Sequence, residues 1–137
     1  MKEGKPKKYN VLFGRWQPPH KSHQWLVEQA SNGGKTPILI YVRDIPPDDK
    51  NPFTTEQTVI MLKELYKEQD VIVRVCPDIL GIHYGRGVGY DIVEHEPSED
   101  IKRVSATAIR EGIKSGDEAW KEMVDDRIHN LVEEYLK

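Results

Sequence analysis

The sequence has few of the features that mark secreted, metal-binding or membrane proteins. It contains a single cysteine, Cys76, which excludes an internal disulfide. Because no other Cys or His stands beside Cys76 at metal-ligand spacing, a reducing compartment is favoured and we expect a cytoplasmic protein. No apolar run approaches the length of a membrane span, and the charged residues 2–8 are not followed by the apolar core of a signal peptide.

Neither sign of charge is in large excess. The formal net charge is −3 although 31% of the residues are charged, so we expect neither nucleic acid nor a membrane surface as a partner. The length of 137 residues suits one domain with one core. We therefore predict a basic, flexible leader over residues 1–8 and a single soluble domain over 9–137.

The first half of the chain alternates between strand and helix patterns. Three apolar runs predict buried strands, at residues 9–13, 37–42 and 71–75. One helix is predicted at 22–30, and another starts at Thr54, which has capping-box spacing to Gln57. This order predicts an α/β fold, a single compact domain with a Rossmann-like, open, mainly parallel sheet and helices on both faces.

The second half is less regular. Residues 79–84 and 90–93 predict two short strands around a glycine-rich turn. A helix is predicted at 105–111, and apolar residues at helical spacing predict a longer helix over 120–135. Trp25 is expected in the core. In the predicted sheet, a ligand would bind beyond the carboxyl ends of the strands.

A stretch rich in histidine and basic residues joins the first strand to the first helix. It contains Gly14, Arg15, Trp16, His20, Lys21, Ser22 and His23. Two prolines stiffen this loop, and Ser22 is suited to cap the helix. The free N–H groups at the helix start attract phosphate, which His20 and His23 can reach from one side. Alone, the two histidines could equally be surface or capping residues, and Trp16 could stack on a base or simply pack.

A second polar stretch supports the phosphate interpretation. Ser105 is suited to cap a helix that carries Thr107 and Arg110 on one face. Because helical side chains lean toward the helix start, Arg110 can reach back over the first turn and grip phosphate oxygens with two N–H groups. The competing interpretation of Arg110 is a surface residue paired with Glu111 or Asp117.

These two stretches resemble the signatures of the HxGH nucleotidyltransferase superfamily. Residues 14–18, with His20 and His23, are similar to the Gly-Arg-Phe-Gln-Pro form found in archaeal-type nicotinamide mononucleotide (NMN) adenylyltransferases. Residues 105–110 match the Ser-x-Thr-x-x-Arg signature, and 51–54 also resemble that branch. Two motifs in the expected order, each at a predicted helix start, are more specific than either alone.

The resemblance implies roles for individual residues. His20 and His23 would contact the triphosphate and stabilise the transition state, and Thr107 and Arg110 would hold the outer phosphates. Gly14, Arg15, Trp16, Lys21, Ser22 and Ser105 would complete the nucleotide site. The implied reaction is attack by the acceptor's phosphate on the α-phosphorus of ATP, with Mg²⁺ assisting and pyrophosphate leaving. It needs no side-chain nucleophile.

The chain departs from the family pattern at several positions. Ser22 replaces a glycine, Lys50 replaces an arginine, and the stretch 76–104 is short. The acceptor pocket is therefore expected to be rebuilt, with Lys50, Tyr84 and Arg86 as candidate acceptor-binding residues. The glycine-rich turn around Arg86 could cradle phosphate or simply close a hairpin.

The expected partners are ATP and a small phosphate-bearing metabolite, with NMN as the leading acceptor. A non-catalytic nucleotide-binding module and a cytidylyltransferase are the alternatives. No protein metal site is predicted, because the adjacent pairs Asp48–Asp49 and Asp125–Asp126 point apart and are usually solvated. A homo-oligomer is an expectation from the resemblance alone.

Overall fold

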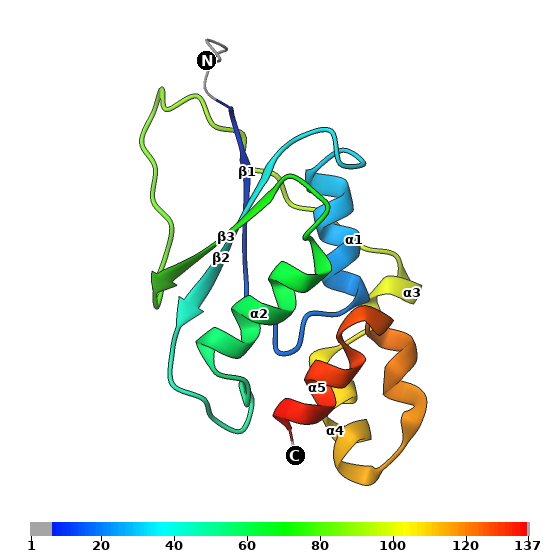
Figure 1. The fold of residues 1–137 in the computed structure, drawn as a ribbon. Coiled ribbons are helices and arrows are strands. Elements are labelled where there is room, and N and C mark those ends of the chain that lie inside the picture. Colours follow the sequence, from blue (N-terminus) through cyan, green and yellow to red (C-terminus); the bar gives the residue numbers. More distant parts are fainter. Residues whose placement is uncertain (1–6, 137) are drawn as a thin grey trace.

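The computed structural model describes residues 7–136, so most of the leader predicted at 1–8 lies outside the described residues. The centre of the fold is a three-stranded parallel sheet in the order β1-β2-β3 (Figure 1). Its strands are β1 (Asn10–Gly14), β2 (Ile38–Asp44) and β3 (Val71–Pro77). The three strands predicted in the first half of the chain, the parallel sheet and the Rossmann-like α/β class are confirmed.

Two helices connect the strands and share one core with them. They are α1 (Lys21–Ala30) and α2 (Thr55–Leu65). In β2 every second side chain, from Ile38 through Ile40 to Val42, is buried, as the period of a strand requires. Val27 of α1 and Met61 of α2 belong to the same buried cluster. Since both crossovers step in one direction across the sheet, their helices cover the same face.

The opposite face of the sheet carries no helix among the described residues. Val11 and Phe13 remain 44% and 40% exposed, and Phe13 stacks on Tyr41 with ring centroids 5.3 Å apart. The expectation of helices on both faces is therefore wrong for this part of the chain. The reason is topological, because residues 7–136 add no further strand beside β1 whose crossover could lay a helix on that face.

The segment from 78 to 98 is irregular, although two strands were predicted there. Leu80 is fully exposed, and Ile92 and Tyr90 are 69% and 78% exposed. Residues 79–93 have the alternating apolar pattern of a hairpin but do not pair with the sheet. A two-stranded hairpin alone is only marginally stable in water. The segment ends at α3 (Glu99–Lys102), where His95 packs edge-on against Trp25. Trp25 is only half-buried, so its predicted place in the core is wrong.

The C-terminal part also differs from its prediction. After α4 (Ala106–Ser115), the expected long helix is divided into η1 (Glu118–Met123), η2 (Asp126–Ile128) and α5 (His129–Tyr135). Asp117 and Asp125 each accept a hydrogen bond from the N–H two residues further on, which favours a new start over continuation of the helix. The apolar stripe is nevertheless buried at Trp120, Val124 and Val132.

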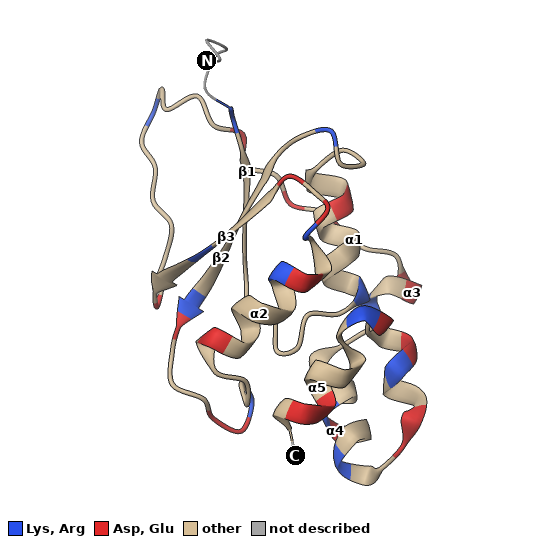
Figure 2. Cartoon of the chain, viewed as in Figure 1, with Lys and Arg blue, Asp and Glu red and all other residues tan. Residues whose placement is uncertain are grey.

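Charge is mixed over the described surface. Figure 2 shows that α1, α2 and α4 each carry basic and acidic side chains. No helix among residues 7–136 has both the length and the apolar character that crossing a membrane demands.

Candidate active site

The start of α1 is built around two histidines. His20, which is 7% exposed, occupies the N-cap position, and its main-chain N–H donates to Nδ1 of His23 at 3.1 Å. His23 thus takes the place that Glu or Gln fills in a capping box. Ser22 lies inside the first turn, so its predicted capping role is wrong. The reason is that the helix begins one residue earlier than expected, at Lys21.

The hydrogen bond to His23 fixes the protonation of its ring. Because Nδ1 accepts a proton donor, the neutral ring carries its own proton on Nε2. The two imidazoles stack with centroids 3.8 Å apart and an angle of 13° between their planes. Burial lowers the pKa of His20 from 6.5 to about 4. Burial and the neighbouring His20 lower the pKa of His23 well below 6.5. Both rings are therefore uncharged at neutral pH when no ligand is bound.

His20 also has an unmet hydrogen-bonding group. Its Nδ1 is buried and has no partner in the described part of the chain. A buried polar atom without a partner costs free energy of about 1–3 kcal/mol. A ligand that hydrogen-bonds to the His20 ring would offset that cost, so this observation fits a binding site at the start of α1.

Trp16 packs its ring against one of the two histidines, His23. It is fully buried, its indole N–H donates to the main-chain oxygen of Tyr41, and its ring lies 4.5 Å from that of His23. Of its two predicted roles, packing is the one that this arrangement provides, since no face of the ring is free for a base. Gly14 makes room for the indole, because a Cβ on Gly14 would lie 2.8 Å from the Trp16 ring.

Gln17 is a site residue that sequence reasoning missed. Its side chain is buried and makes two hydrogen bonds to Phe53, accepting from N–H at 2.9 Å and donating to the main-chain oxygen at 3.3 Å. Gln17 thereby ties the histidine loop to the loop that precedes α2. Its place in the Gly-Arg-Phe-Gln-Pro-like stretch was the available signal.

The second predicted motif lies directly against the first. Ser105 caps α4 by accepting from Ala108 N–H, as predicted. From α4, Arg110 donates to the main-chain oxygen of Gln17 at 2.8 Å and lies 3.5 Å from Oγ1 of Thr107. Within residues 7–136, Arg110 forms no ion pair, so the alternative pairing with Glu111 or Asp117 is not formed.

The electrostatics around Arg110 favour an anionic ligand. Burial, and next the positive charge of Arg15, lower the pKa of Arg110 below its ordinary value. The two guanidinium groups repel one another, and a phosphate that lies between them stabilises both. Lys21 is exposed at the first helical position and adds a third cation beside the histidines.

The candidate acceptor residues are not gathered at this site. Lys50 is exposed in the loop before α2, and its N–H donates to Asp48. Tyr84 is 65% exposed in the irregular segment. Arg86 is exposed in the same segment, which in Figure 1 leaves β3 on the side of the sheet away from the start of α1. The structure therefore brings the two nucleotide motifs together but leaves Tyr84 and Arg86 apart from them.

Comparison with known proteins agrees with this arrangement. The family model described as Cytidylyltransferase-like matches residues 11–95, which hold the sheet from the second residue of β1 onward and the histidine loop. The chain belongs to the cytidylyltransferase-like family.

Two curated relatives are similar over almost the whole of this family member. One is the nicotinamide-nucleotide adenylyltransferase of Pyrobaculum neutrophilum, which is 25% identical over 89% of this chain and 86% of its own length. The other is the nicotinamide-nucleotide adenylyltransferase of Caldivirga maquilingensis, which is 24% identical over 90% of this chain and 86% of its own length. Together with the family match, these relatives identify the chain as a nucleotidyltransferase.

Proposed function

We propose that this nucleotidyltransferase transfers the adenylyl group of ATP to NMN, forming NAD and releasing pyrophosphate. The observation that carries the proposal is the junction of the two motifs, in which Arg110 of α4 reaches the histidine loop at Gln17. The choice of ATP and NMN is supported by the two curated relatives, both of which are named nicotinamide-nucleotide adenylyltransferases. A cytoplasmic location, favoured by the single cysteine, belongs to the same proposal.

In the proposed reaction, an oxygen of the acceptor phosphate attacks the α-phosphorus of ATP. The bond from that phosphorus to the oxygen bridging to the β-phosphate breaks, and pyrophosphate leaves with the electron pair. No bond to the protein forms, so the site's task is to stabilise charge on the reacting phosphates. The Nε2–H of His23 and the N–H groups at the start of α1 are the available donors, and the unpartnered Nδ1 of His20 donates when the ring carries its proton there.

The remaining residues of the proposed site have distinct tasks. Arg110 and Thr107 hold the outer phosphates, and Arg15 and Lys21 supply further positive charge. Ser22 and Gly14 shape the backbone beside the nucleotide, while Trp16 and Ser105 hold the two helix starts. The proposed acceptor-binding residues remain Lys50, Tyr84 and Arg86. For Tyr84 and Arg86, this role requires the irregular segment to approach the site when acceptor binds.

Mg²⁺ would accompany the triphosphate. Among residues 7–136 no group of three or more His, Cys, Asp or Glu side chains could hold a metal ion. Mg²⁺ commonly keeps several waters and binds through substrate phosphates. The side chains of the site therefore fit an ion that arrives with ATP rather than one held by the protein alone. The ion would neutralise phosphate charge, while the histidines and arginines of the chain orient the phosphates.

The test is a turnover assay with ATP or CTP, Mg²⁺ and a panel of phosphate-bearing acceptors that includes NMN. We expect pyrophosphate and a product with the mass of NAD from ATP and NMN. His20→Ala and Arg110→Ala should slow product formation about a hundredfold or more, while Lys114→Gln, a charge change at the far end of α4, should not.

Other outcomes distinguish the alternatives. Turnover with CTP in place of ATP would support a cytidylyltransferase, the activity in the family's description. Tight nucleotide binding with no turnover of any acceptor would support a non-catalytic module. Ser22 is the feature that favours that alternative, because it adds a Cβ and a hydroxyl at a position where the family has glycine.

A further inference from the structure

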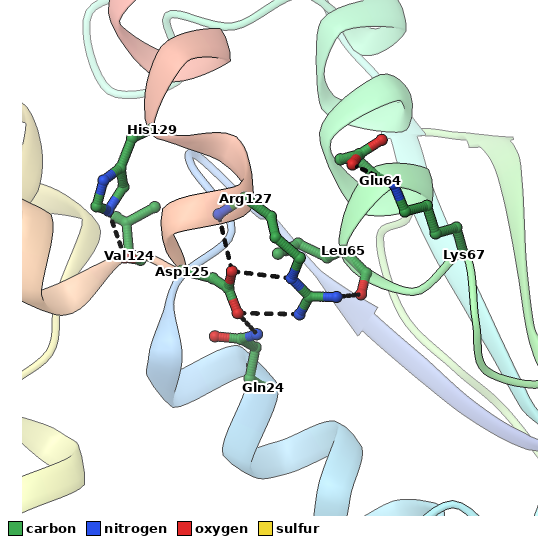
Figure 3. A network of polar contacts seen from close by, with 8 residues as sticks. All are labelled: Gln24, Glu64, Leu65, Lys67, Val124, Asp125, Arg127 and His129. Carbon is green, nitrogen blue, oxygen red and sulfur yellow. Dashed lines mark hydrogen bonds and ion pairs between the residues drawn. The ribbon is translucent and has the colours of Figure 1, made fainter.

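A polar bridge connects the first turn of α1 to the C-terminal segment (Figure 3). Nε2 of Gln24, the residue that follows His23, donates to Oδ2 of Asp125 at 3.0 Å. Asp125 lies between η1 and η2, 101 residues further along the chain. Within residues 7–136, this is the one side-chain hydrogen bond that links the first turn of α1 to another element.

Asp125 is itself held in place by Arg127. The guanidinium makes a two-pronged contact, with Nε on Oδ1 and a terminal nitrogen on Oδ2, both at 2.9 Å. Its other terminal nitrogen donates at 2.8 Å to the main-chain oxygen of Leu65, the last residue of α2. Hydrogen bonds from Arg127 hold the pKa of Asp125 far below its ordinary value, so the carboxylate stays ionised. The bridge therefore spans from α1 to the end of α2.

The histidine pair depends on the orientation of this same helical turn. Both the 3.1 Å hydrogen bond to His23 Nδ1 and the 3.8 Å ring stack require His20 and His23 to keep their present relation to the loop. At its other end, α1 is fixed by Asn10, whose amide donates to the main-chain oxygen of Ala30 at 2.7 Å. Gln24 and Asp125 supply the matching attachment at the start of the helix.

We propose that Asp125 and Gln24 are positioning residues for the histidine pair, with Arg127 fixing Asp125 against α2. They touch neither substrate nor reacting atoms in this proposal. The bridge sets the rotation and tilt of the first turn of α1, and through it the direction in which the His23 Nε2–H points. The catalytic part of this inference rests on the proposed nucleotidyl transfer, whereas the effect on the ring does not.

The decisive variants exchange the two partners of the bridge. Gln24→Glu places two carboxylates face to face and breaks the contact. Adding Asp125→Asn restores one amide and one carboxylate with their sides exchanged, so the hydrogen bond to residue 24 can form again. The Asn oxygen can still accept from Nε of Arg127, but the contact of Arg127 with Oδ2 is lost because Oδ2 also accepts from Gln24 in the wild type. Gln24→Leu removes the amide without introducing charge. The matched control is Glu64→Gln, which breaks the exposed Glu64–Lys67 ion pair at the end of α2, also drawn in Figure 3.

The first readout is turnover at a temperature where circular dichroism shows every variant folded. Because a misplacement near 1 Å costs up to about a hundredfold in rate, we expect kcat to fall about tenfold in Gln24→Glu and Gln24→Leu, with KM for ATP changed less than about twofold. The double variant should recover part of kcat, because one Arg127 contact is lost, and Glu64→Gln should match the wild type. Lowered melting temperatures with unchanged kcat would overturn the proposal.

The second readout is the His23 ring in long-range ¹H–¹⁵N NMR spectra of the ligand-free protein. The wild type should show the form protonated at Nε2, whereas Gln24→Glu should show averaging between the two neutral forms, reversed in the double variant. An unchanged His23 pattern in both Gln24 variants would overturn the positioning role. If the wild type turns over no nucleotide, the proposed function fails, while the ring spectra still decide this inference.

Discussion

The guanidinium of Arg110 donates a 2.8 Å hydrogen bond to the main-chain oxygen of Gln17, 93 residues earlier in the chain. This contact joins α4 to the loop in front of α1 and makes one site from two separate motifs. The same guanidinium lies 3.5 Å from Thr107 Oγ1 and is opposed by the charge of Arg15. Arg110 is thus held beside the histidine loop, where we propose that the triphosphate binds.

Replacing Arg110 should mainly weaken triphosphate binding and transition-state stabilisation. For Arg110→Ala we expect kcat/KM to fall about a hundredfold or more, because one charge-assisted donor to a reacting phosphate commonly contributes that much. Arg110→Lys should recover part of the loss, since it keeps the charge but not the planar fork. Steady-state kinetics with varied ATP measure both. Equal activity of the Lys variant and the wild type would contradict a two-pronged grip.

Gln17→Ala should reduce stability as well as activity. The substitution leaves the buried N–H and carbonyl of Phe53 without their partner, and each such group costs about 1–3 kcal/mol. We expect the free energy of unfolding in urea to fall by about 2 kcal/mol or more. Gln17→Glu retains the acceptor but buries a carboxylate against the Phe53 carbonyl, so at neutral pH it should be at least as destabilising as Gln17→Ala. A variant series with no difference in unfolding midpoint would show that the Phe53 contacts do not stabilise the fold.

The buried histidines should make stability depend on pH in a defined window. The pKa of His20 falls from 6.5 to about 4 on folding, so below pH 6.5 the unfolded chain binds a proton that the folded chain does not. Stability from this group is present above pH 6.5 and is lost as the pH falls toward 4, by about 3 kcal/mol in total. Urea unfolding at several pH values measures the loss. His20→Gln should flatten the slope, and an identical slope in that variant would assign the effect to other groups.

Ser22 should limit nucleotide affinity. Ser22→Gly removes the Cβ and hydroxyl from the first turn of α1, where the family has glycine, and we expect KM for ATP to fall severalfold. Because glycine is unfavourable within a helix, the variant should also be less stable by about 0.5–1 kcal/mol. Isothermal titration with a non-hydrolysable ATP analogue and a thermal melt separate the two effects. Ser22→Ala tests the hydroxyl alone, and weaker binding by the Gly variant would show that Ser22 contributes a favourable contact.

Local pattern determined the first half of the fold. The apolar runs of β1, β2 and β3 and the capping box at Thr54 and Gln57 depend on neighbouring residues, and all appear as expected. The same holds for Ser105 at the start of α4. The two signature motifs were also visible in the sequence, because each is a short run of residues at a helix start.

Tertiary structure decided the contacts between residues that lie far apart in the sequence. The junction of Arg110 with Gln17, the clasp of Gln17 on Phe53 and the bridge from Gln24 to Asp125 join segments that no local pattern connects. Tertiary structure also explains the predictions that were wrong. The apolar pattern at 79–93 needs a partner strand in order to form a sheet. At 120–135 the helix is interrupted because the side chains of Asp117 and Asp125 accept hydrogen bonds from main-chain N–H groups. Sequence by itself determined the strands and helices of the first half and the positions of the two motifs. The fold alone decided which elements cover the sheet and which side chains hold the histidines, because hydrogen bonding and burial depend on distance in space rather than along the chain.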